Sequence, residues 1–188
     1  MFAVWAVALL CLVSLSRSAD PACEDLVRPV DPLDPAHLEG ARSIVAGSMT
    51  TPEYAEKFKT RDSASISFVN GTSFSRVFRS NDSCQYLNSN ITLEGSSFNF
   101  HQYNITVTFL QTSCPDCLLL RFDNMSKELQ RLYLFSKRRE VEQKEMDEFA
   151  AQAQCLNSLP PIVMDPTKPL CPEEMSNDAE AQPDKKTE

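Results

Sequence analysis

The sequence predicts an all-β fold, an eight-stranded antiparallel up-and-down barrel with one C-terminal α-helix packed outside it. The middle of the chain holds about eight short runs in which apolar and polar residues alternate, typical of an up-and-down barrel or a sandwich. No long helical pattern separates these runs, although a parallel sheet would need crossover helices. The one long helical pattern follows the last run. Because a barrel can enclose a binding site, this fold favours a carrier over a catalyst.

Turn signals and changes of period delimit the predicted strands. Apolar residues recur at every second position from residue 63 onward, and Asn70-Gly71 is a strong signal for a tight turn. Another turn is expected at residues 94–96, and a break near Tyr103. The strand candidates cover residues 42–49, 63–68, 74–79, 84–93, 97–103, 104–111, 117–123 and 129–135.

Two helices are predicted. A short one is expected at residues 51–58, with Thr51 as its N-cap and Pro52 in its first turn. A longer one at residues 140–157 carries an apolar stripe, and its other face consists of Glu, Lys and Gln. We expect the stripe to pack on the barrel wall, because the acidic flanks disfavour an anionic membrane surface. The stripe consists of Met146, Phe149, Ala150, Ala153 and Leu156.

The ends of the chain are expected to lie outside the folded domain, which we place at residues 20–172. Residues 1–19 have the form of a secretory signal peptide, an apolar run followed by small residues. Residues 173–188 are acidic and poor in apolar side chains, so they predict a disordered tail. Residues 20–38 hold four prolines and predict an extended arm. The net charge of −8 and the scattered basic residues argue against a nucleic-acid partner.

Cysteines and glycosylation sequons indicate secretion into blood plasma or another body fluid. Six cysteines follow the signal, an even number typical of disulfides, although fifteen pairings are formally possible. They are Cys23, Cys84, Cys114, Cys117, Cys155 and Cys171. Five Asn-x-Ser/Thr sequons predict N-glycans on surface turns or outward strand positions. They lie at Asn70, Asn81, Asn90, Asn104 and Asn124.

Cys114-Pro-Asp-Cys117 is the sharpest candidate for chemistry. A Cys-x-x-Cys pair can exchange disulfides when its first thiol has a lowered pKa, but the negative charge of Asp116 would raise that pKa. We therefore expect a local structural disulfide rather than a redox site. A metal site is disfavoured by the scarcity of histidine, and no nucleophile elbow or phosphate loop occurs. We predict no catalytic residue, no metal and no cofactor.

Seven segments carry a resemblance to a known family. They are LEGARSIVAGSM at 38–49, PEYAEK at 52–57, the turn at Asn70, CQY at 84–86, LRFD at 120–123, KEMDEF at 144–149, and Cys155-Leu156. With these segments the chain resembles a lipocalin of the α-1-acid glycoprotein (orosomucoid) branch. Within that branch it is most similar to fish tributyltin-binding proteins and to the pufferfish saxitoxin and tetrodotoxin-binding protein. One departure is Gly40-Ala41-Arg42, where lipocalins usually have Gly-x-Trp, so the closed end must be packed differently.

The resemblance implies a ligand cavity and two disulfides, Cys23 with Cys155 and Cys84 with Cys171. Period two turns one face of each strand inward, and matching to orosomucoid strands selects a mostly apolar, aromatic lining. The alternative for the apolar residues is an ordinary filled core. A charged side chain that points inward must be paired or reach water. Arg76 therefore either meets an anionic or polar group of the ligand, or the predicted register is wrong and Arg76 points out of the barrel. The predicted ligand-binding residues are Ile66, Phe68, Phe74, Arg76, Phe78, Leu118, Leu120, Phe122, Tyr133 and Phe135.

The predicted function is that of a secreted, monomeric glycoprotein carrier of small, mainly hydrophobic or cationic ligands, with no stable membrane insertion. The resemblance adds tributyltin, saxitoxin and tetrodotoxin as candidate ligands, and the negative net charge favours cations by steering. One alternative is an acute-phase immunomodulatory glycoprotein that acts through its surface and glycans. Another is a thiol oxidoreductase that uses Cys114 and Cys117.

Overall fold

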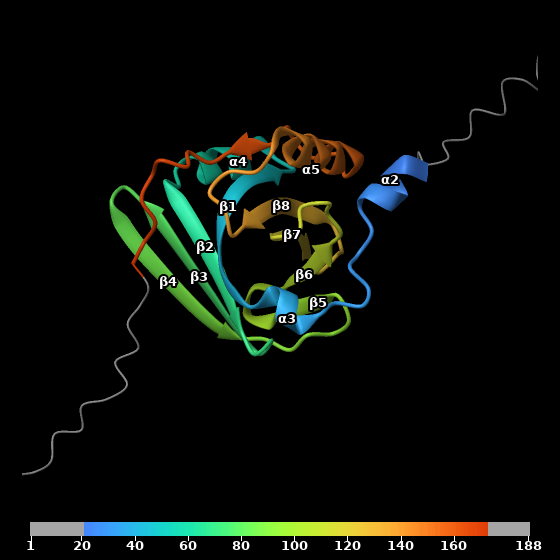
Figure 1. The fold of residues 1–188 in the computed structure, drawn as a ribbon, viewed down its shortest axis with the longest axis horizontal. Coiled ribbons are helices and arrows are strands. Elements are labelled where there is room, and N and C mark those ends of the chain that lie inside the picture. The colour runs from blue at the N-terminus through green and yellow to red at the C-terminus, as the bar shows by residue number, and fades with distance from the viewer. Residues whose placement is uncertain (1–20, 173–188) are drawn as a thin grey trace, which may run out of the picture.

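A computed structural model describes residues 21–172, which form one curled sheet with short helices around it and a longer helix near the C-terminal end of the described chain (Figure 1). The predicted signal peptide at 1–19 and the predicted tail at 173–188 lie outside the described residues. No helix within the described residues has the length and apolar character that crossing a membrane requires.

Eight antiparallel strands follow one another as an up-and-down meander, which confirms the predicted fold class. Their order in the sheet is β4-β3-β2-β1-β8-β7-β6-β5. Over residues 21–172, consecutive strands of these eight pair with each other except β4 and β5, and β1 pairs with β8 to bring the two halves together. The strands are β1 (Gly40–Met49), β2 (Ser63–Val69), β3 (Ser73–Ser80), β4 (Ser83–Asn90), β5 (Ser97–Phe100), β6 (Ile105–Leu110), β7 (Cys117–Asn124) and β8 (Leu129–Ser136).

The junction between β4 and β5 differs from the other junctions of the barrel. Within the described residues these two strands share no ladder of backbone hydrogen bonds. Phenyl rings of β3 and β5 meet inside the barrel: the centroid of Phe74 in β3 lies 5.8 Å from that of Phe98 and 5.3 Å from that of Phe100 in β5. Such ring contacts contribute beyond the apolar area that they bury. The barrel is therefore hydrogen-bonded along seven junctions, and near the eighth, rings from β3 and β5 pack against each other.

Left-handed backbone positions make the tight turns. Asn70 (φ 52°) and Gly71 (φ 64°) lie between β2 and β3, as the sequence predicted. Asn81 (φ 49°) and Asp82 (φ 62°) form the two-residue connection of β3 to β4, which suits residues that tolerate positive φ. The predicted break near Tyr103 is a 3₁₀ turn, η1 (His101–Tyr103), after which Asn104 (φ 53°) starts the return to β6.

In the described part of the chain four α-helices surround the barrel: α2 (Pro21–Leu26), α3 (Pro35–Leu38), α4 (Pro52–Lys59) and α5 (Gln143–Cys155). Thr51 caps α4 as predicted, since its side chain accepts a hydrogen bond from the backbone N–H of Tyr54. The N-terminal arm differs from the prediction of an extended chain, because α2 and α3 interrupt it. A short strand that the sequence did not predict, β9 (Ile162–Val163), pairs with β1.

Helix α5 packs against the outside of the barrel, as predicted, although it is shorter than residues 140–157. It begins with a capping box in which Glu142 and Glu145 each accept a hydrogen bond from the other's backbone N–H. Phe149 and Ala153 from the predicted stripe are buried against outward-facing apolar residues of the sheet. Those residues include Ala46, Leu119, Leu132 and Leu134.

The two ends of the barrel differ. In a meander successive connections alternate between ends, so α4, the β3–β4 turn, η1 and the β7–β8 turn share one end, here called the mouth. At the other end, the floor, Arg42 stands where a lipocalin usually has Trp. Its guanidinium is buried and donates hydrogen bonds to the carbonyl oxygens of Leu38 (2.9 Å) and Asp116 (3.2 Å), among others. Hydrogen bonds from a buried guanidinium group therefore hold this end of the barrel, at the position where the family resemblance implies an indole ring.

Three disulfides hold the chain: Cys23–Cys155, Cys84–Cys171 and Cys114–Cys117. The first two are those that the orosomucoid resemblance implied. They attach the N-terminal arm to the end of α5 and the C-terminal segment to β4.

Candidate ligand-binding cavity

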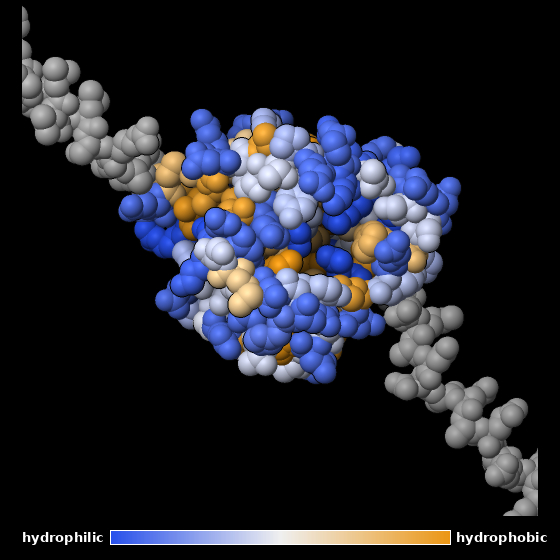
Figure 2. All heavy atoms as spheres, turned by 180° about the vertical axis from the view of Figure 1, so that it is seen from behind, coloured by the Kyte–Doolittle hydropathy of each residue, from blue (hydrophilic) through white to orange (hydrophobic). Residues whose placement is uncertain are grey.

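A cavity of about 390 Å³ occupies the mouth half of the barrel. This volume is at the lower end of the range of small-molecule sites, about 300–1,000 Å³. Figure 2 shows the side opposite to Figure 1, where hydrophobic surface lies in a hollow with a hydrophilic rim. The lining residues are Tyr54, Ile66, Phe74, Arg76, Leu87, Phe100, Tyr103, Ile105, Phe122, Gln130, Arg131, Tyr133 and Phe135.

Six of the ten predicted ligand-binding residues line this cavity. They are Ile66, Phe74, Arg76, Phe122, Tyr133 and Phe135. The other four do not. Phe68, Leu118 and Leu120 are buried in the apolar core, and Phe78 is half-buried and packs against that core.

The floor half of the barrel is filled by phenyl rings. The ring centroid of Phe68 lies 5.2 Å from that of Phe74, 6.0 Å from Phe98 and 5.7 Å from Phe109. Leu38, which is fully buried, belongs to the same core. The alternative of a filled core therefore holds for the floor half, while the mouth half is hollow.

Arg76 lies on the inward face of β3 and lines the cavity. Its Nε is buried and has no hydrogen-bond partner within the described residues. Burial lowers the pKa of the Arg76 guanidinium from its ordinary value, and the nearby charges of Arg61 and Arg131 lower it further. The alternative in which Arg76 points out of the barrel is therefore wrong. Its guanidinium group faces the cavity without a compensating carboxylate among the described residues.

Two further arginines accompany Arg76. The guanidinium of Arg131 lies over the ring of Phe122, 4.8 Å from its centroid, and the buried Nε of Arg131 also lacks a partner within the described part of the chain. Arg61 donates a hydrogen bond from Nη1 to the hydroxyl of Tyr133 (3.2 Å).

No carboxylate neutralises this group of arginines. Among residues 21–172, none of the three guanidinium groups forms an ion pair. They are held by aromatic rings instead, and both Arg61 and Arg76 also lie within 5.5 Å of the ring centroid of Phe78. Contacts between cations and aromatic faces are only modestly stabilising, so they do not replace the hydrogen-bond acceptors and the opposite charge that an anion offers to a guanidinium group.

Sequence reasoning missed Arg131, although the signal was available. Arg131 shares the inward face of β8 with Tyr133 and Phe135, so the same period of two selects it. Arg61 could not be found in this way, because it precedes β2 and belongs to no alternating run. Tyr103 was also missed, because it lies in the 3₁₀ turn between two strands.

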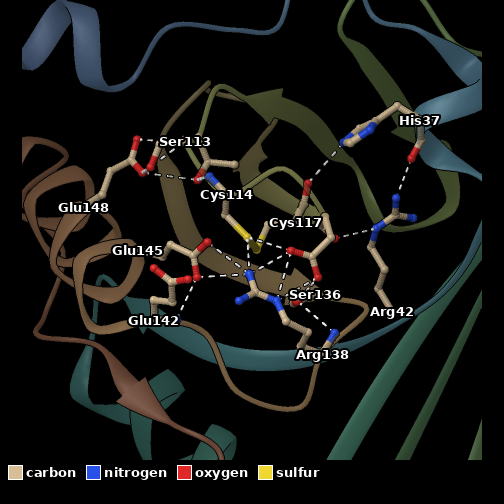
Figure 3. The surroundings of a disulfide bond; sticks show 12 residues. His37, Arg42, Ser113, Cys114, Cys117, Ser136, Arg138, Glu142, Glu145 and Glu148 are labelled. Carbon is tan, nitrogen blue, oxygen red and sulfur yellow. Dashed lines mark hydrogen bonds and ion pairs between the residues drawn. A yellow bond between two sulfur atoms is a disulfide. The ribbon is translucent and has the colours of Figure 1, made fainter.

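The Cys114–Cys117 disulfide lies at the floor, in a network of charged groups (Figure 3). Both cysteines are buried, with 2% of their surface exposed, which keeps a partner thiol from reaching them. Arg138 ion-pairs with Asp116 (2.7 Å) and with Glu145 of α5 (3.0 Å), and its hydrogen bonding lowers the pKa of Asp116 to about 2. This arrangement is that of a structural link between the sheet and α5.

The same turn contains the one group of metal-ligand side chains found close together in residues 21–172: Cys114, Asp116 and Cys117. Both sulfur atoms are joined in the disulfide, and the third group is ion-paired with Arg138. A metal ion needs free thiolates here, so these residues do not fit one.

A second hollow, of about 420 Å³, lies beside the floor between residues 30–37 and the β6–β7 connection. Its polar groups serve the local fold. Asp34 accepts a hydrogen bond from the backbone N–H of Ala36, and Nε2 of His37 lies 3.3 Å from the carbonyl oxygen of Cys117. The barrel cavity, with its unpartnered arginines, is the better candidate for a ligand site.

Comparison with known proteins identifies the fold. No family model and no curated protein matches this chain. Among solved structures, the siderocalin Ex-FABP, described as functioning through dual ligand specificities, is 19% identical with a TM-score of 0.57, and covers 68% of this chain and 93% of its own. Siderocalin Q83, described as having a dual ligand binding mode, is 14% identical with a TM-score of 0.60, over 74% and 96%. The up-and-down barrel, its outer helix and these neighbours together show that the chain has the lipocalin fold.

Proposed function

We propose that this protein is a secreted, glycosylated carrier that reversibly binds small amphipathic molecules with an anionic group in its barrel cavity. The observation that carries the proposal is a pair of arginines, Arg76 and Arg131, which line a mostly apolar cavity without carboxylate partners among the described residues and have Arg61 close by. The rings would hold the apolar part of the ligand, and the guanidinium groups would bind its anion. The siderocalin neighbours, which are ligand-binding proteins by their descriptions, support the general role.

The cavity charge argues against the cationic ligands expected from the net charge of −8. Surface carboxylates act through solvent and salt, which screen them over about 8 Å at physiological ionic strength. The arginines act at contact distance in a partly desolvated site, where charges interact more strongly. A guanidinium toxin such as saxitoxin or tetrodotoxin would add another cation beside Arg76. Tributyltin would depend on the aromatic wall alone.

A bound anion would supply partners for buried arginine donors that have none within the described residues. A buried donor without a partner costs about 1–3 kcal/mol, and hydrogen bonds to charged groups contribute about 1.5–3 kcal/mol. An anion that meets Arg76 and Arg131 therefore removes a cost as well as adding a contact. An apolar ligand of the same shape would add the contact with the rings only.

Two naphthylamine probes test this proposal, because they share one ring system and differ by one sulfonate. We expect 8-anilinonaphthalene-1-sulfonate to bind at least about tenfold more tightly than neutral N-phenyl-1-naphthylamine, as one charge-assisted contact would give. Fluorescence titration of the purified glycoprotein, with each probe displacing the other, measures both dissociation constants. Tighter binding of the neutral probe would refute the anionic preference. Absence of displaceable binding by either probe would refute the carrier function.

A further inference from the structure

The five sequons divide between the two ends of the barrel. Asn81 lies in the β3–β4 turn, Asn104 follows η1, and Asn124 ends β7, so all three belong to the mouth. Asn70 lies in the β2–β3 turn and Asn90 ends β4, which places both at the floor. The floor pair is adjacent in space, because the backbone N–H of residue 91 donates to the carbonyl oxygen of residue 72 (2.9 Å).

Two of the three mouth sequons, Asn104 and Asn124, lie close in sequence to residues that line the cavity. Asn104 stands between Tyr103 and Ile105, both of which line it, and Tyr103 is 52% exposed at the rim. Asn124 is two residues beyond the lining residue Phe122. No lining residue lies within two positions of Asn70 or Asn90 at the floor, nor of Asn81, which its turn alone places at the mouth.

The side chains can carry glycans without loss of the fold. Asn81 and Asn104 are exposed, and within the described residues their side chains make no hydrogen bond. The amide nitrogen of Asn124 donates to Oε2 of Glu128 (2.9 Å). Glycosylation replaces one of the two amide hydrogens, so the other can keep this bond.

We propose that N-glycans on Asn81, Asn104 and Asn124 surround the mouth and restrict the passage of ligands according to their size. The inference rests on the proposed carrier function. In the modification, the asparagine amide nitrogen displaces a lipid diphosphate from C1 of its oligosaccharide donor. The N–C1 bond forms and the C1–O bond breaks. The lipid diphosphate leaves as an anion, and the amide nitrogen loses one proton to the solvent.

A glycan that obstructs the mouth acts on rates. It excludes volume on the path in and on the path out, and it does not touch the bound molecule. Association and dissociation therefore slow by the same factor, and the dissociation constant does not change. A larger ligand is slowed more than a small one.

Matched variants test this at the two ends. Glycoprotein from a eukaryotic secretory host is compared with a mouth variant, S83A/N104G/S126A, and with a floor variant, N70G/T92A. Asn104→Gly and Asn70→Gly are closely matched, because both positions have left-handed backbone (φ 53° and 52°) that glycine adopts readily. Unaltered chain whose glycans are trimmed enzymatically to one sugar gives a second measurement without substitution. Peptide mass spectrometry reports which sites carry glycans.

Stopped-flow binding of the sulfonated naphthylamine probe, free and joined to a bulky tail, gives both rate constants. We expect the mouth variant and the trimmed protein to bind and release the bulky probe at least about threefold faster, with an unchanged dissociation constant. The floor variant should match the parent. Unmodified mouth asparagines, equal rates for parent and mouth variant, or an equal effect of the floor variant would overturn the inference while leaving the carrier function intact. Failure of every form to bind either probe would overturn both.

Discussion

Replacement of Arg76 by methionine should make the protein more stable and a poorer binder of anions. Methionine keeps an unbranched side chain of similar length, so it fills the space among Phe74, Phe78 and Tyr133 without the charge. It removes a buried Nε that has no partner within the described residues and a cation that faces Arg61 and Arg131. Replacing uncompensated buried charge by apolar groups is often neutral or stabilising.

The expected rise in Tm follows from the free-energy cost of leaving the buried Nε of Arg76 without a hydrogen-bond partner. Relief of about 1–2 kcal/mol, within the range for one unsatisfied buried group, should raise the Tm by about 2–8 °C in a domain of this size. Loss of one charge-assisted contact of about 1.5–3 kcal/mol should weaken binding of the sulfonated probe by about 10- to 100-fold. The neutral probe should bind with nearly unchanged affinity.

Thermal unfolding and fluorescence titration measure the two effects on one preparation. Arg79→Met is the matched control, because Arg79 lies on the same strand, faces outward and pairs with Asp82 (3.0 Å). Asp82 is 94% exposed, so loss of this surface pair should cost about 0–1 kcal/mol and should not alter probe binding. A lower Tm for the Arg76 variant, or equal affinity for the anionic probe, would show that Arg76 is compensated and that the charge argument is wrong.

Three further outcomes are expected. Gly47→Ala should cost about 1–3 kcal/mol by urea unfolding, because its Cβ would lie 2.8 Å from the ring of Phe58, which packs over this strand. Asp116→Asn should flatten the dependence of unfolding free energy on pH between about 4 and 2. The folded-state pKa of about 2 lies below the ordinary value, so the carboxylate stabilises above about pH 4 and loses its effect as the pH falls through 2. Removing the disulfide with C84S/C171S should lower stability by at most about 4–5 kcal/mol, measured by Tm without reductant.

The sequence predicted the barrel because its signals are local and repeated. Period-two alternation, the Asn70-Gly71 turn and the capped helix at 51–58 each depend on neighbouring residues, and the structure confirms all three. The α5 stripe follows from the helical period in the same way, so its packing on the barrel wall was also predictable. The short strand β9 lacked such a signal, because two residues are too few to show a period.

The cavity was predicted only in part, since its depth depends on packing between strands that are distant in sequence. Alternation correctly turned Phe68 and Leu120 inward, but it could not tell that phenyl rings from β2, β3, β5 and β6 meet beneath the cavity and fill the floor. The charge of the site was likewise hidden. It arises where a loop residue, Arg61, comes close to Arg76 and Arg131 from two separate strands.

The junction between β4 and β5, where rings of β3 and β5 are in contact but no ladder joins the strands within the described residues, is the one that we expect to widen most easily. Rings in contact can slide and re-pack at small cost, whereas a ladder of backbone hydrogen bonds stretches only by breaking. The circumference near Phe74 and Phe100 can therefore widen while the other seven junctions keep their register. A guest bulkier than the resting hollow would be admitted by parting that junction, and amide hydrogens of β5 should exchange with deuterium earlier than those of β8.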